Sequence, residues 1–245
     1  MRKLLVGVIA GVVMLAVAAI AMATTTTTFD QKYSTKTTNK STGTKFSTTS
    51  SEDQNAENNH QPKSTREFDI TFPAGSKIDY TAAPVCKNLD ESADDPCPKN
   101  TKVGSGHAQV LLTFGPPIDA LVTAYNRKNG LFLFVEPQAP NQAPVVLKPA
   151  YHGLTLKTAT PPNCVASTNE NGHCVDGSGN PGFEAVLTEF DLTTKAITKG
   201  KGKHRKTYLK TPPKCPKGGW VFKAKITYAD GSSVSPASTS PCKKP

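Results

Sequence analysis

The chain has 245 residues, with 29 Lys and Arg against 19 Asp and Glu, and six cysteines. When an apolar leader and a low-complexity spacer at the N-terminus are set aside, about 180 residues remain. That is enough for one packed domain and too few for two ordinary ones. The sequence contains a single long apolar segment and neither heptads nor helical repeats. This excludes coiled coils, helical repeat proteins and proteins that cross a membrane several times.

Residues 1–23 predict an export signal. Two basic residues precede an uncharged apolar segment, which ends in Ala21-Met22-Ala23, the small residues that signal peptidase requires. Cleavage after Ala23 is therefore expected. The segment is also just long enough to span a bilayer, which leaves an uncleaved anchor as the alternative. We expect a secreted protein, or one attached to the cell surface or envelope, that meets a membrane only through this segment.

Residues 24–66 predict a disordered linker. They contain 19 Ser and Thr, and their only aromatic residues are Phe29, Tyr33 and Phe46. Such a composition buries too little apolar surface to offset the entropy lost when the backbone is ordered. The expected structure is a flexible tether, and an O-glycosylated stalk is the alternative.

Residues 67–245 predict a β domain. Segments 67–72 and 222–228 alternate polar and apolar residues, and segment 107–114 has an apolar side. This period of two is typical of strands with one face in the core. Residues 131–135 are apolar on both faces, which favours a central strand.

Turn signals separate these strands. Asn129-Gly130 predicts a hairpin with a type I′ turn, and Asp230-Gly231 predicts a second hairpin near the C-terminus. The apolar phase of the segment around Thr188 changes there, which indicates a bulge. About ten candidate strands and no amphipathic helix after the leader predict a single antiparallel β-sandwich, immunoglobulin-like or jelly-roll-like in topology.

Six cysteines in an exported chain predict three disulfides. The sequence permits many connectivities, and we expect nearest neighbours to pair: Cys86–Cys97, Cys164–Cys174 and Cys215–Cys242. A zinc site is not expected, because the chain has no CxxC motif and only His173-Cys174 is suggestive. The acidic run at 90–95 lacks the ordered spacing of a calcium loop, so we expect no metal.

Cysteine and turn motifs recur through the domain, at Pro73-Ala74-Gly75, Ala83-Pro84-Val85-Cys86, Cys97-Pro98, Val103-Gly104-Ser105-Gly106, Thr211-Pro212-Pro213-Lys214-Cys215 and Pro241-Cys242. In these motifs the chain resembles a group of uncharacterised secreted, cysteine-paired β-sandwich proteins of high-GC Gram-positive bacteria. The resemblance implies a fold and a compartment. It implies no activity and no catalytic residue.

Motifs for nucleophilic, zinc, phosphate-loop or dinucleotide chemistry are absent from the sequence. For Val103-Gly104-Ser105-Gly106 we expect a tight approach into the strand at 107–114 rather than a phosphate-binding nest. Glycosidases of the jelly-roll type need paired carboxylates. Glu67 and Glu189 each begin an E-x-D-x-x-E-like pattern, but Phe72 and Thr194 stand where the closing glutamate is required. We therefore expect no catalytic residue and no cofactor, and a carbohydrate-active hydrolase with an unrecognised carboxylate site is the alternative.

Positive charge is concentrated near the C-terminus. Residues 195–245 carry 13 Lys and Arg and one acid, whereas residues 24–194 carry 14 Lys and Arg and 18 acids. The densest part is a glycine-containing loop with Lys199, Lys201, Lys203, Arg205 and Lys206. Such a loop attracts polyanions, and a solvated hairpin whose lysines prevent edge-to-edge strand pairing is the alternative.

Nucleic acid is not the expected partner of this loop, because only Tyr208 is near enough to stack on a base. The sequence thus predicts a secreted or cell-envelope structural or binding module without enzymatic activity. We expect it to dock to anionic cell-wall polymers or polysaccharides through the basic loop.

Overall fold

The protein is described by a computed structural model, which covers residues 25–52, 62–90, 96–112, 116–138, 144–160, 167–168, 174–175 and 185–244. The predicted signal lies outside these ranges. The helices within them are three short 3-10 turns, η1 (Tyr80–Ala82), η2 (Lys99–Thr101) and η3 (Gly202–His204). No helix in the described ranges has the length and apolar character needed to cross a bilayer.

The main sheet is formed by the longer strands and by the short ones at their edges. These are β1 (Thr25–Tyr33), β2 (Thr44–Glu52), β3 (Thr65–Thr71), β5 (Lys102–Leu112), β6 (Ile118–Arg127), β7 (Gly130–Pro137), β8 (Val145–Leu147), β9 (Ala150–His152), β10 (Thr155–Ala159), β13 (Ala185–Thr194), β17 (Trp220–Tyr228), β18 (Ser233–Val234) and β19 (Ala237–Ser240). Three separate two-stranded pairs join β4 (Lys77–Ile78) to β16 (Leu209–Lys210), β11 (Ser167–Thr168) to β12 (Cys174–Val175), and β14 (Thr198–Lys199) to β15 (Lys206–Thr207).

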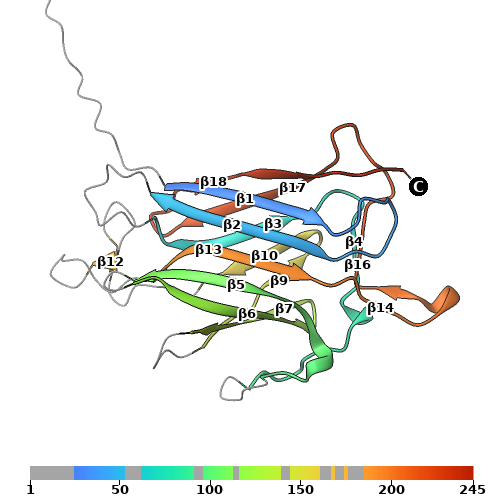
Figure 1. The fold of residues 1–245 in the computed structure, drawn as a ribbon, viewed down its shortest axis with the longest axis horizontal. Coiled ribbons are helices and arrows are strands. Elements are labelled where there is room, and N and C mark those ends of the chain that lie inside the picture. The colour runs from blue at the N-terminus through green and yellow to red at the C-terminus, as the bar shows by residue number, and fades with distance from the viewer. Residues whose placement is uncertain are drawn as a thin grey trace, which may run out of the picture.

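The main sheet folds back on itself. Its strand order is β1-β2-β13-β5-β6-β7-β9-β10-β3-β17-β18, with β8 paired to β7 and β19 paired to β17, and its pairings are antiparallel. In Figure 1, β1, β2, β13 and β5 form a layer in front of β17, β3, β10 and β9. The prediction of an all-β antiparallel sandwich is confirmed. Its two layers are continuous through β6 and β7 rather than separate sheets.

Aromatic side chains fill the space between the layers. Phe46 of β2 packs against Phe68 of β3 with ring centroids 5.5 Å apart, and Phe29 of β1 lies 6.5 Å from the same ring. Tyr33 contacts Trp220 and Phe222 of β17, with centroids 5.3 and 4.8 Å apart. Each fully buried ring contributes about 1.5–3 kcal/mol through apolar burial, so the two layers depend on strand β1 as much as on β17.

The prediction of a disordered linker over residues 24–66 is wrong for most of that segment. Strands β1 and β2 pair along their whole length, from Thr25↔Glu52 to Tyr33↔Thr44, and β2 continues the sheet onto β13. The physical reason is the position of the aromatics rather than their number, since they recur on the inward face and reach the opposite layer. Threonine itself also favours strands, because its branched side chain suits a pleated surface.

The predicted hairpin at Asn129-Gly130 is confirmed, although its turn differs in type. Arg127 pairs with Gly130, so the turn residues are Lys128 and Asn129. A type I′ turn requires a positive φ at both turn residues. Here Asn129 has a φ of 59°, whereas the φ of Lys128 is not positive. Gly130 is required for another reason, because a Cβ there would lie 2.1 Å from the Pro149 carbonyl oxygen.

Two other local predictions are confirmed. The register of β13 shifts between Leu187 and Glu189, which is the bulge predicted near Thr188. Asp230 and Gly231 form the turn between β17 and β18, with Gly231 at φ 82°.

Two of the predicted disulfides are present. Cys86–Cys97 and Cys215–Cys242 are bonded, with Cα–Cα distances of 5.6 and 5.7 Å. The predicted Cys164–Cys174 pair lies outside the described side chains. Two disulfides in one domain indicate a chain that matures in an oxidising compartment.

Candidate polyanion-binding site

The cations predicted to bind a polyanion lie together on one short hairpin. Strands β14 and β15 pair through Thr198↔Thr207 and Lys199↔Lys206, and η3 forms the tip of the connecting loop. Gly200 has a φ of 83°, and a Cβ on it would lie 2.6 Å from the His204 carbonyl oxygen. The glycine therefore allows the tight loop in which Lys199, Lys201, Lys203, Arg205 and Lys206 are all exposed.

The base of this hairpin is attached to η1 and to Asp79, the residue that precedes it. The Lys206 Nζ donates to the Thr81 hydroxyl at 2.9 Å. The amide of Asp79 donates to the Tyr208 carbonyl at 2.8 Å, and the Tyr208 amide donates to the Ile197 carbonyl at 3.0 Å. These bonds fix where the hairpin leaves the sandwich.

Other segments bring lysines to the same end of the molecule. Lys210 of β16 is paired with Lys77 of β4 and forms an isolated bridge with Ser41, in the loop between β1 and β2. In that loop, the Lys40 carbonyl accepts from the Thr211 amide at 2.9 Å. Main-chain pairing thus aligns lysines that are far apart in the sequence.

The C-terminal tail joins the same loop. The Lys243 amide donates to the Lys36 carbonyl at 2.7 Å, and Lys243 forms a parallel bridge with Thr37. The disulfide Cys215–Cys242 holds this tail close to the segment that contains Lys214. The tail therefore adds its own cations to those of the loop.

We call this set of cations the basic end. It lies where the C-terminus, β4, β16 and β14 meet, at the right in Figure 1. It consists of Lys36, Lys40, Lys77, Lys199, Lys201, Lys203, Arg205, Lys206, Lys210, Lys214, Lys243 and Lys244.

Sequence reasoning missed three of these cations. Lys36 and Lys40 fall in the segment predicted to be a disordered linker, and Lys77 precedes the basic region by more than a hundred residues. Counting charge along the chain gives no signal for them. Only the pairing of β4 with β16, and of the β1–β2 loop with the tail, brings them to the site.

No carboxylate of the described residues forms an ion pair with a cation of the basic end. Within the described residues, the ion pairs are Lys32–Asp30, Lys63–Asp230, His107–Asp191 and Lys157–Asp69, all outside the basic end. Asp79 is the nearest acid in sequence to Lys77, and its carboxylate accepts from the Thr81 amide and hydroxyl at 2.9 and 2.6 Å. The charges therefore add up to a positive field directed into solvent.

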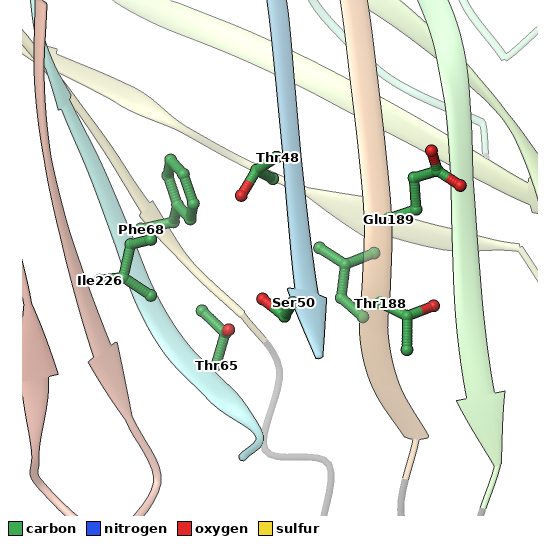
Figure 2. Close-up of a pocket in the computed structure, with 8 residues that line it drawn as sticks. Thr48, Ser50, Thr65, Phe68, Thr188, Glu189 and Ile226 are labelled. Atoms are coloured by element: carbon green, nitrogen blue, oxygen red, sulfur yellow. The ribbon is translucent and has the colours of Figure 1, made fainter. Parts of the chain in front are cut away.

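The carboxylates considered for glycosidase chemistry lie on outer faces of the sheet. Asp69 is 3.7 Å from Lys157, and Asp191 is 3.5 Å from His107. Glu189 borders a small pocket between the layers, but Figure 2 shows its carboxylate directed away from Phe68 and Ile226. That pocket has a volume of about 10 Å³ and contains one carboxylate, so it accommodates no sugar ring.

Gly104 and Gly106 lie inside β5 rather than ahead of it, and their backbone faces β13 closely. A Cβ on Gly106 would lie 2.0 Å from the Asp191 carbonyl oxygen. In the part of the chain that the structure describes, His, Cys, Asp and Glu form no group of three that is able to hold a metal ion. His173 and most of the acidic run at 90–95 lie outside that part.

Comparisons with protein-family models, with curated proteins and with solved structures found no match. The resemblance to secreted proteins of high-GC Gram-positive bacteria therefore stays a prediction.

Proposed function

We propose that the protein is a non-enzymatic binding module, secreted or held at the cell envelope, that attaches to anionic polymers through its basic end. The observation that carries this proposal is the convergence of exposed cations from five separate segments: the β1–β2 loop, the start of β4, the β14–β15 hairpin, the loop after β16 and the C-terminal tail. The positive field is strong because many segments contribute cations to it, and it exists only when the chain is folded.

The chemistry of the basic end favours a polymer over a small ligand. Its cations are exposed except for the half-buried Lys210. Each exposed pair with an anion contributes only about 0.2–1 kcal/mol, so useful affinity requires many simultaneous contacts. A wall polymer that repeats a phosphate or carboxylate group makes such contacts. The binding is then sensitive to salt, because exposed charges are screened over about 8–10 Å.

A nucleic acid is a weaker candidate. Recognition of single strands relies on aromatic side chains on which bases stack. Tyr208, the aromatic closest in sequence to the hairpin cations, is 4% exposed and so is too buried to stack on a base. The lysines alone do not distinguish a nucleic acid from any other polyanion.

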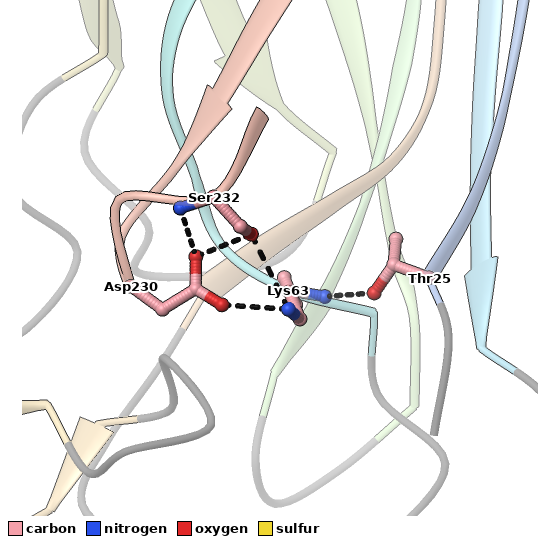
Figure 3. A network of polar contacts seen from close by, with 4 residues as sticks. All are labelled: Thr25, Lys63, Asp230 and Ser232. Carbon is pink, nitrogen blue, oxygen red and sulfur yellow. Dashed lines mark hydrogen bonds and ion pairs between the residues drawn. The ribbon is translucent and has the colours of Figure 1, made fainter. Parts of the chain in front are cut away.

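The position of the basic end relative to the N-terminal strand also supports a partner that lies away from the membrane. Strand β1 starts at the end of the sandwich opposite the basic end (Figure 1). There Lys63 donates to Asp230 at 2.6 Å from its Nζ and to the Thr25 hydroxyl at 3.0 Å from its amide, which fixes the start of β1 (Figure 3). With 9 residues, β1 spans about 30 Å at about 3.3 Å per residue. An N-terminal attachment therefore leaves the basic end facing away from it.

The test is retention on poly(glycerol phosphate) as sodium chloride is increased. Replacing Lys201, Lys203, Arg205 and Lys206 with Ala removes four contacts and is expected to weaken binding roughly tenfold or more. The matched control replaces four exposed lysines elsewhere, Lys128, Lys148, Lys223 and Lys225, with Ala and so changes the net charge equally. Equal loss in both variants, or retention that does not depend on salt, contradicts the proposal.

A further inference from the structure

A cavity of about 50 Å³ lies between the two layers of the sandwich, close to the basic end. Most of its lining is apolar, contributed by residues such as Phe46, Leu156 and Leu192. Gln31 of β1 and Tyr208, which directly precedes β16, bring polar atoms into the same lining. The cavity is therefore a mainly apolar space with a few polar groups on its wall.

One of those polar groups, the Gln31 Oε1, has no hydrogen-bond partner among the described residues, and its residue is 2% exposed. The other, the Tyr208 hydroxyl, is 4% exposed as a residue and is hydrogen-bonded to Tyr151, so the pair of hydroxyls keeps capacity for a further bond. Gln31 lies in β1 and Tyr208 lies between β15 and β16, so the two residues come from segments far apart in the sequence. A buried polar atom without a partner destabilises the folded state substantially, so such atoms in native proteins are bound to something.

We propose that this cavity is a binding site for a small cluster of water molecules, which connects the Gln31 Oε1 with the Tyr208 hydroxyl. A water needs about 10–15 Å³ of such space and two to four polar partners, so a cavity of this size holds a few. Tyr151 lines the same cavity, and its hydroxyl is hydrogen-bonded to that of Tyr208. Burial raises its pKa to about 12, so it stays protonated and able to donate at neutral pH.

The size of the cavity favours water over a larger apolar ligand. Dry engineered cavities that take up benzene have a volume of about 150 Å³ and a purely apolar lining. The present cavity is smaller, and its wall carries the unpartnered Gln31 Oε1 and the hydroxyls of Tyr151 and Tyr208. The site therefore takes a small neutral molecule that both donates and accepts hydrogen bonds.

The experiment counts long-lived internal waters in solution by magnetic relaxation dispersion of the water nuclei. Gln31→Leu and Tyr208→Phe each remove one polar partner and leave an apolar side chain of similar size, and each is expected to lose at least one long-lived water. Tyr33→Phe is the matched control, because the Tyr33 hydroxyl already bonds Ser76 at 2.5 Å and is not part of the lining. Its count should equal that of the unmodified protein.

An equal count in all four proteins overturns the proposal. A crystal structure gives an independent check that does not depend on the stability of any variant. We expect ordered water density within hydrogen-bond distance of the Gln31 Oε1 and the Tyr208 hydroxyl. A cavity without density in a well-ordered crystal overturns the proposal, as does density for an organic additive alone.

Discussion

Asp230 is the most enclosed carboxylate among the ion pairs of the described residues, with its side chain 10% exposed against Lys63 at 24%. Its burial acts to raise its pKa, but the hydrogen bonds from Lys63 and Ser232 and the positive charge of Lys63 outweigh that effect. The pKa of Asp230 is therefore lowered. At the residue scale, this carboxylate connects β17 to the start of β1.

Asp230→Asn is expected to lower the free energy of unfolding at pH 7 by about 1.5–3 kcal/mol, the range for a hydrogen bond to a charged group. A lowered pKa contributes stability above the unfolded-state value, which is lost as the pH falls through the folded-state value. The difference between the two proteins should therefore shrink below about pH 4. Denaturant unfolding at pH 7 and pH 3 measures the difference in free energy of unfolding between the two proteins. A difference that does not change with pH contradicts the account.

Gly106 shows how a single missing side chain permits two strands to pair. Gly106→Ala places a methyl group against the Asp191 carbonyl of β13, within 2.0 Å. The strands must separate, and we expect a loss of about 1–3 kcal/mol in the free energy of unfolding, as for overpacking. Ser105→Ala, on the exposed side of the same strand, is the control and should change it by less than about 0.5 kcal/mol. Similar values for both would exclude the close approach as the cause.

At the scale of elements, the seam between β1 and β19 is closed by hydroxyl groups rather than by main-chain pairing. The Ser238 hydroxyl accepts from the Gln31 amide at 2.8 Å and donates to the Gln31 carbonyl at 3.0 Å. The Ser240 hydroxyl accepts from the Tyr33 amide at 3.1 Å. Two serines thus satisfy backbone groups that would otherwise be exposed at a sheet edge.

The double variant Ser238→Ala/Ser240→Ala is expected to open this seam locally. Each lost bond leaves a β1 amide without a partner, at a cost of about 1–3 kcal/mol. Hydrogen exchange should report faster exchange, by at least roughly tenfold, at the Gln31 and Tyr33 amides. Ser47→Ala, on an exposed face of β2, serves as the control. Unchanged exchange at both amides would show that the serines do not close the seam.

Elements with a local pattern could be predicted from the sequence. Alternation located β3 and β17, the phase change located the bulge at Thr188, and proximity paired Cys86 with Cys97. Strands β1 and β2 could not be predicted from composition, because their aromatics gain stability only from partners such as Phe68 and Trp220 far along the chain. The cations of the β14–β15 hairpin were predicted as a site, because they are close together in the sequence. Lys36, Lys40 and Lys77 were not, because only tertiary pairing brings them to the basic end.

At the scale of the whole molecule, unpaired positive charge is concentrated at one end of the sandwich. The chain carries a formal net charge of +10, and the basic end collects cations without carboxylate partners in the described ion pairs. The opposite end holds the start of β1 and the Lys63–Asp230 pair. Such a polar molecule is oriented by an anionic surface before it makes contact, which speeds association at low salt.

The central claim is that the fold assembles one basic surface from segments that the sequence separates. The most direct measurement is the affinity for poly(glycerol phosphate) of the variant Lys36→Ala/Lys40→Ala/Lys77→Ala, which leaves the predicted hairpin intact. We expect a loss of roughly threefold or more relative to the unmodified protein, together with a weaker dependence on salt. An affinity equal to that of the unmodified protein at every salt concentration would contradict the account.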